Sequence, residues 1–238
     1  MAETTSAVIA GASLFTLLND IAVFIRDSYL RMDVWERTTQ DPHNRRLNTI
    51  GETRWWSKDV AVKKVFGSFQ NPQSGLYLDI NTLHVVEMME KLQPQARIKA
   101  KTYEEALLKY ETVVTALLST RIFDITSPLS KYLQTSGLDI LKAYNFICET
   151  QDGLQKLRTD IKTLKTAADN FVRIMNDILE QMNLEFEIET SLPEKRTRRK
   201  KTMPGEIAHD DVICGPFKIY EIEIYNVIID TATECMRR

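Results

Sequence analysis

Apolar side chains recur every three or four residues along nearly the whole chain of 238 residues. This spacing gathers them on one face of an α-helix, so each helix has a stripe to bury against another. We therefore expect an all-α fold, a helical bundle. The longer helices are expected over residues 5–36, 55–66 (or 57–66), 78–92, 102–120 and 138–183.

The last of these segments, 138–183, keeps the helical spacing throughout and predicts one very long helix. At about 1.5 Å per residue it would extend roughly 65–70 Å, more than the width of a compact domain. We expect a bend near Asp152 and Gly153. The alternative is a helical arm that protrudes from the bundle.

Two shorter segments complete the helical pattern. Ser127 followed by Pro128 is typical of a helix start and predicts a short helix that ends at Gly137. The segment 217–236 fits a strand through Ile222 and Ile224, and fits a helix through the wider spacing of its apolar residues. We favour the helix, because no second strand is available to pair with it.

Composition limits the classes of function. The net charge of −2 indicates that any anionic partner is held by local patches and not by the protein as a whole. The apolar run from Val8 to Ile25 is interrupted by Asn19 and Asp20, which argues against a signal peptide or a membrane span. We expect no membrane association.

The cysteines and histidines do not suggest a metal or redox site. The three cysteines are widely spaced, as is typical of a reducing compartment, and the three histidines show no ligand spacing with them. The sequence therefore predicts no metal site and no cofactor. These residues are Cys148, Cys214, Cys235, His43, His84 and His209.

A basic segment, Lys195–Lys201, carries six cations in seven positions. These charges repel one another and do not pack, so we expect a solvated basic loop over 184–215. Its charge could simply be balanced by the glutamates that precede it. A lysine and arginine run of this kind is also sufficient as a nuclear-import signal, which predicts a nuclear location.

A second notable segment is Glu52–Lys58, which contains Arg54 and the adjacent Trp55 and Trp56. A guanidinium and two indoles, placed where a loop leads into a helix, can stack on bases and bind phosphate. The alternative is a structural corner with a partly buried ring. The sequence does not decide which of the two indoles faces outward.

Taken in order, four motifs resemble the middle of a hAT-superfamily transposase. Proteins of this sort include transposase-derived animal proteins described as zinc finger MYM-type-like or kinase-inhibitor-repressor-like. The resemblance covers nearly the whole chain, although each motif is short. The motifs are Leu47-Asn48-Thr49-Ile50-Gly51-Glu52-Thr53-Arg54-Trp55, Ser127-Pro128-Leu129-Ser130-Lys131-Tyr132-Leu133-Gln134, Arg196-Thr197-Arg198-Arg199-Lys200 and Met236-Arg237-Arg238.

The resemblance implies two domains. Residues 1–70 would be a helical remnant of a ribonuclease H-like catalytic domain, and 76–236 would be the all-helical insertion domain with the basic loop 184–215. The family cuts DNA with two aspartates and one glutamate that hold two metal ions. These acids are expected outside this chain, which we interpret as an internal fragment. We therefore expect no enzyme activity and no catalytic residue.

The resemblance also implies DNA-binding residues. Trp55 matches a tryptophan that stacks on a flipped base, and Arg54 would bind phosphate or pair with an acidic neighbour. Arg196, Arg198 and Arg199, followed by Lys200, match an arginine-rich stretch that contacts DNA. The expected function is a catalytically incomplete, nuclear, DNA-associated or protein-interaction module.

An alternative function is a helical protein-interaction scaffold with a nuclear-import signal and no DNA contact. We expect protein partners to bind an exposed apolar face of the first helix, because its natural partner would be the missing catalytic sheet. The sequence leaves the partner and the oligomeric state open.

Overall fold

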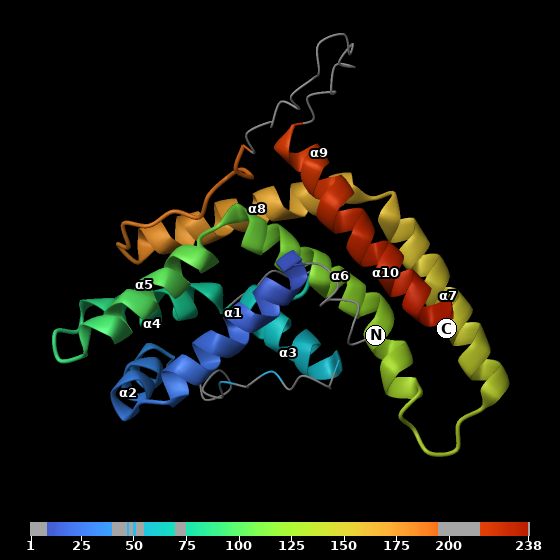
Figure 1. Ribbon diagram of the computed structural model, residues 1–238, viewed down its shortest axis with the longest axis horizontal. Helices are drawn as coiled ribbons and strands as arrows, with labels where there is room; N and C mark the ends of the chain where they lie inside the picture. The colour runs from blue at the N-terminus through green and yellow to red at the C-terminus, as the bar shows by residue number, and fades with distance from the viewer. Residues whose placement is uncertain are drawn as a thin grey trace, which may run out of the picture.

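A computed structural model describes residues 9–39, 47, 50, 55–69, 75–194 and 215–237. Every element in these ranges is helical and none is a strand, so the predicted all-α class is confirmed (Figure 1). The elements are α1 (Ile9–Arg26), α2 (Tyr29–Thr38), α3 (Trp55–Phe66), α4 (Leu76–Met88), α5 (Pro94–Leu107), α6 (Tyr110–Tyr132), α7 (Ile140–Arg158), α8 (Ile161–Gln181), α9 (Pro216–Tyr220), the π-helical turn η1 (Glu221–Tyr225) and α10 (Asn226–Arg237).

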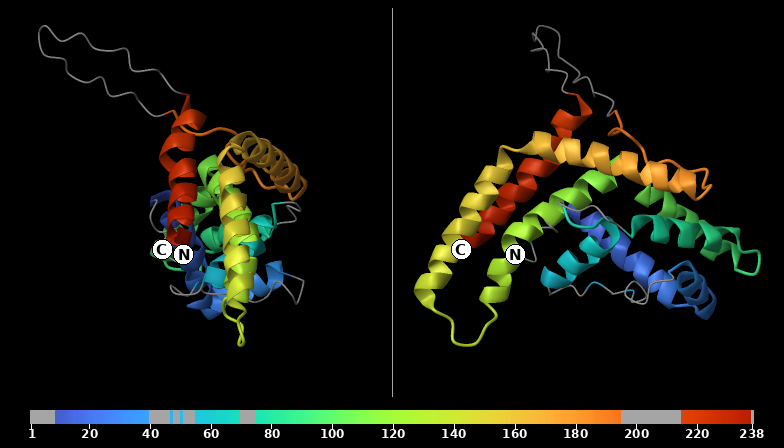
Figure 2. Two further views of the ribbon diagram at one scale, coloured as in Figure 1. Left: turned by 90° about the vertical axis from the view of Figure 1, so that its right-hand side faces the viewer. Right: turned by 180° about the vertical axis from the view of Figure 1, so that it is seen from behind.

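Helix α6 is the centre of the molecule. It contacts α1, α3, α5, α7 and α8. α4 and α5 form a helical hairpin, and α8 lies across α4 and α6 (Figure 2). α10 runs beside α7, where Arg158 donates a hydrogen bond to Asp230 over 2.6 Å (Figure 1).

The core is continuous across residue 70. Phe15 of α1 packs against Phe123 of α6, and Phe66 of α3 packs against Phe171 of α8, each pair with ring centroids 6.0 Å apart. All four rings belong to one cluster of buried apolar side chains. The segments before residue 70 and after residue 76 therefore fold around a shared core, and their assignment to two domains stays a prediction.

The predicted first helix is two helices. Ser28 has extended backbone angles, φ −139° and ψ 128°, and forms the N-cap of α2. Its side chain makes no capping hydrogen bond, so the extended backbone alone marks the break between α1 and α2. The turn redirects α2 so that it buries Val34 and Trp35.

The prediction that the first helix has an exposed apolar face is wrong for α1. Its apolar side chains are buried against neighbouring helices, so this face already has partners within the chain. Only Tyr29 and Leu30, at the start of α2, are large apolar residues exposed in this described region. The buried residues are Leu14, Phe15, Leu18, Ile21, Phe24 and Ile25.

The predicted helix over 102–120 is also divided, between α5 and α6. Lys109 has extended backbone angles and is the N-cap of α6. The carbonyl of Leu108 accepts a hydrogen bond of 2.8 Å from the amide of Glu189, which comes from the segment after α8. This distant contact helps to satisfy the backbone where one helix ends and the next begins.

Ser127 and Pro128 do not start a helix. Both lie inside α6, which continues to Tyr132. The Ser127 hydroxyl donates a hydrogen bond of 2.8 Å to Asp59 of α3, so it joins two helices and does not cap one. The buried face of α6 also continues beyond Pro128 to Leu129, which explains why the helix persists there.

The predicted very long helix is α7 and α8, joined at Thr159 and Asp160. The Tyr225 hydroxyl of η1 donates to the Leu157 carbonyl, and Arg121 of α6 donates to Asp160 over 2.7 Å. These hydrogen bonds hold the chain at the point where α7 ends and α8 begins.

The prediction of a bend near Asp152 and Gly153 is therefore wrong in position, because the break lies at Thr159 and Asp160. Gly153 lies within α7, where an added Cβ would come within 3.1 Å of the Ile125 side chain. The glycine serves close packing of α6 on α7 and does not bend the helix.

The last segment, 217–236, is helical as predicted. α9, η1 and α10 follow one another without a gap, and η1 is a local π-helical turn. A π-helical turn rotates the residues that follow it around the helix axis. Tyr225, at its end, is fully buried.

Candidate functional site

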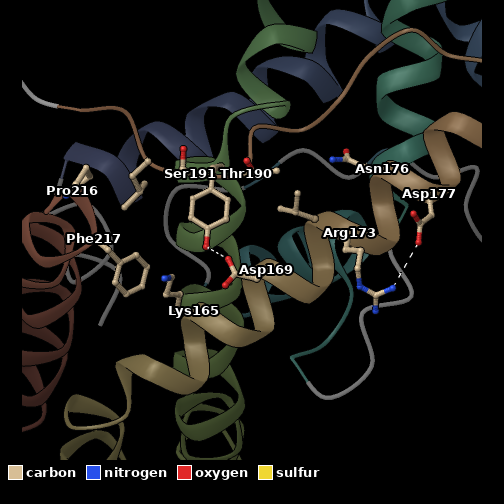
Figure 3. A pocket seen from close by; sticks show the side chains of 12 residues that line it. Lys165, Asp169, Arg173, Asn176, Asp177, Thr190, Ser191, Pro216 and Phe217 are labelled. Atoms are coloured by element: carbon tan, nitrogen blue, oxygen red, sulfur yellow. Dashed lines mark hydrogen bonds and ion pairs between the residues drawn. The ribbon is translucent and has the colours of Figure 1, made fainter.

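A pocket of about 590 Å³ lies along α8 (Figure 3). One wall consists of successive turns of α8, and the others come from the segment after α8, from the start of α9 and from Tyr110. The lining residues are Tyr110, Lys165, Asp169, Val172, Arg173, Asn176, Asp177, Thr190, Ser191, Leu192, Pro216 and Phe217.

Asn176 fixes the segment after α8 in place. Its side-chain amide accepts a hydrogen bond of 2.8 Å from the Ile188 amide and donates one of 3.2 Å to the Ile188 carbonyl. Ile188 itself is buried in the core. This two-point contact holds Thr190, Ser191 and Leu192 over the pocket.

We expect Asn176→Leu to lower the free energy of unfolding by about 1–2 kcal/mol, because both Ile188 groups would be left unpaired in a partly buried place. Urea denaturation measures this loss. Hydrogen exchange of the Ile188 amide should accelerate as well. The control is Asn170→Leu at an exposed site on the same helix, and an equal loss there would contradict the role given to Asn176.

Charged groups of both signs face the pocket. The Tyr110 hydroxyl donates a hydrogen bond of 2.6 Å to Asp169, and burial together with this bond raises the pKa of Tyr110. The Lys165 amine lies 5.5 Å from the centre of the Phe217 ring, which is a cation–π contact (Figure 3). Arg173 pairs with Asp177 at 3.8 Å.

This combination suits binding more than nucleophilic chemistry. The described lining holds neither an imidazole nor a thiol, its aliphatic hydroxyls, Thr190 and Ser191, are exposed, and the Tyr110 hydroxyl is bonded to Asp169. Lys165 and Arg173 supply positive charge, Asp169 and Asp177 supply negative charge, and Phe217 supplies an apolar ring. Such a pocket can accept an extended ligand with charged and apolar parts.

The predicted DNA-binding residues fall outside the described side chains. Arg54 and the basic residues Arg196, Arg198, Arg199 and Lys200 are not among the described residues. Trp55 is the first residue of α3, but its side chain is not described either. The predicted binding role of these residues therefore stays a prediction.

A second group of possible ligand residues was not predicted from the sequence. His84 and Glu87 of α4 and Glu104 of α5 place one possible ligand atom each within 4.8 Å of one another. Burial raises the pKa of Glu104 to about 7, helped by the charge of Glu87 and opposed by Lys101. The spacing of His84 and Glu87, one helical turn apart, was the available signal.

Comparison with known proteins identifies no relative: the chain matches no protein-family model, and no curated protein or solved structure matches it significantly. Among the described helices, none combines the length and the apolar character that a membrane crossing requires.

Proposed function

We propose that this chain is a hAT transposase-derived module that associates with DNA in the nucleus and has no catalytic centre of its own. The ordered sequence motifs motivate the family, and the all-α fold is compatible with a helical insertion domain. Arg54, Trp55 and the basic segment Lys195–Lys201 are the proposed contacts with DNA.

One structural observation supports this function more than any other. Thr190–Leu192, which precede the basic segment in the sequence, line the same pocket as Pro216 and Phe217, which follow it. Lys165 and Arg173 of α8 line this pocket too.

The basic segment carries six cations in seven positions on a protein whose net charge is −2. Cations that bind DNA phosphates release condensed counterions, and this release drives association without reading the sequence. The proposed contact is therefore with the phosphate backbone. Arg196, Arg198 and Arg199 are its main residues, and Lys200 adds a fourth charge.

We expect Arg196→Ala, Arg198→Ala and Arg199→Ala, made together, to weaken binding to a mixed-sequence DNA duplex by at least about tenfold at low salt. Fluorescence anisotropy with the full chain measures this loss. The matched control replaces the exposed Lys91, Lys131 and Lys142 with alanine, which removes the same charge at sites distant in sequence from the basic segment. An equal loss in the control would show that only net charge matters and would contradict a local contact.

The scaffold function remains the second candidate, because one apolar patch is unusually exposed. Ile140, Leu141 and Tyr144, in the first turns of α7, are 79%, 77% and 65% exposed. Exposed apolar side chains in a cluster are typical of protein-binding surfaces. Negligible DNA binding that is the same in the native chain and in the triple arginine variant would favour this function over DNA association.

A further inference from the structure

Two buried polar atoms face each other between α4 and α5 without a hydrogen bond. They are Nδ1 of His84 and Oε2 of Glu104, which lie 3.8 Å apart. That distance is too long for a hydrogen bond. Glu104 is only 3% exposed, and a buried polar atom without a partner destabilises the fold unless something binds it.

A third group completes the arrangement. Glu87 lies one helical turn after His84 on α4, so both side chains face Glu104 of α5. One ligand atom from each residue lies within 4.8 Å of the others. The ligands of a tetrahedral Zn²⁺ ion are about 3.3 Å apart, so small movements of these side chains would bring their ligand atoms to that spacing.

The helical hairpin holds these residues in place. Arg97 of α5 donates a hydrogen bond of 2.6 Å to the Glu87 carbonyl, which fastens the start of α5 to the end of α4. Phe186 lies against the His84 ring, with centroids 4.7 Å apart and planes at 66°. This ring restricts the orientation of the imidazole and shields one side of the group from water.

The charge of the group also suits a cation. Two carboxylates meet here, and the nearest ion-pair partner of Glu87 is Lys101 at 3.7 Å. A divalent ion would balance both carboxylates and bind the unpaired imidazole nitrogen. One nitrogen and two oxygens form a ligand set typical of Zn²⁺ and related transition metals, whereas Mg²⁺ and Ca²⁺ prefer oxygen alone.

We propose that His84, Glu87 and Glu104 bind one divalent transition-metal ion, with Zn²⁺ as the representative ion. The three side chains supply three ligands and leave a fourth position for water. The ion joins α4 to α5 and stabilises the hairpin. This site is independent of the proposed DNA contact, so either proposal can fail without affecting the other.

Isothermal titration calorimetry of the full chain with Zn²⁺ tests the proposal. We expect one ion per chain, and we expect His84→Ala and Glu104→Gln each to weaken binding at least tenfold. Glu87→Gln, at a half-buried position, should weaken binding similarly, and it tests the site even if the buried Glu104→Gln prevents folding. Glu105→Gln is the matched control, because Glu105 is exposed and adjacent to Glu104 in sequence.

Cobalt spectroscopy separates this site from binding by cysteine. Co²⁺ at His84, Glu87 and Glu104 should give visible d–d bands without a thiolate charge-transfer band, whereas Co²⁺ on Cys148 or Cys235 would give that band. The proposal would be overturned by an absence of Zn²⁺ binding, by a thiolate band, or by affinities unchanged in the Glu87→Gln variant.

Discussion

Phe171→Ala is expected to lower the free energy of unfolding by about 3–5 kcal/mol, the usual cost of emptying a buried aromatic site. Phe171 lies on α8, is 1% exposed and packs against Phe66 of α3. The smaller side chain would leave a cavity between helices that come from opposite sides of residue 70 in the sequence. Urea denaturation followed by circular dichroism measures the change.

The control for this substitution is Tyr144→Ala, which removes an aromatic ring that is 65% exposed. Its expected effect is within about 0.5 kcal/mol, as for most surface changes. A loss below about 1 kcal/mol for Phe171→Ala would contradict the shared core. In that case residues before 70 and after 76 would be stabilised separately.

Asp79→Asn is expected to stabilise the protein by about 2–4 kcal/mol near pH 8. Asp79 lies in the first turn of α4 and is buried. Burial raises its pKa from 3.8 to about 7, and the charge of Lys64 opposes this shift only in part. The native chain therefore holds a buried carboxylate charge at high pH, and asparagine would remove it.

The sign of this effect follows from proton linkage. A carboxyl whose pKa is raised by folding binds more protons in the folded than in the unfolded state, so stability falls as the pH rises from about 4 to about 7. The advantage of Asp79→Asn should therefore shrink towards zero near pH 4. Glu104, whose pKa is also about 7, changes stability in the same direction.

Urea denaturation of the native chain and of Asp79→Asn at about pH 8 and about pH 4.5 tests this prediction. Glu90→Gln serves as the control, because Glu90 is an exposed carboxylate. An advantage of the same size at both pH values would show that Asp79 acts through packing or hydrogen bonding and not through its charge.

The presence of helices could be predicted from the sequence, whereas several of their ends could not. Apolar spacing is a local property, and it runs without interruption across Leu108 and across Asp160. The breaks at these points coincide with contacts from remote segments, the Glu189 amide at Leu108 and the Arg121 side chain at Asp160. The local spacing of apolar residues cannot reveal such contacts between segments that are far apart in the sequence.

The predictions of a bend at Gly153 and of a helix start at Pro128 were wrong for a related reason. Gly153 and Pro128 are both helix-breaking residues in isolation, and each lies inside a helix here. Gly153 allows Ile125 to approach α7, and the residue before Pro128 is held by Asp59. Packing between helices outweighs the local preference in both cases.

The candidate sites were less predictable than the fold. His84 and Glu87 have a spacing that the sequence displays, but Glu104 joins them only because α4 and α5 form a hairpin. The pocket needs Thr190–Leu192 and Phe217 to meet on α8, and Asn176 secures the first of these through Ile188. The arginines that motivated the DNA prediction lie outside the described residues.

The most direct test of the proposed function is the salt dependence of DNA binding by the native chain. Anisotropy titrations of a mixed-sequence duplex at several salt concentrations give the slope of log K against log salt. Four phosphate contacts predict a slope of about −3 to −4, and the triple arginine variant should lose about two to three units of that slope. Binding that is negligible at low salt, or a slope unchanged in the variant, would contradict DNA association through the basic segment.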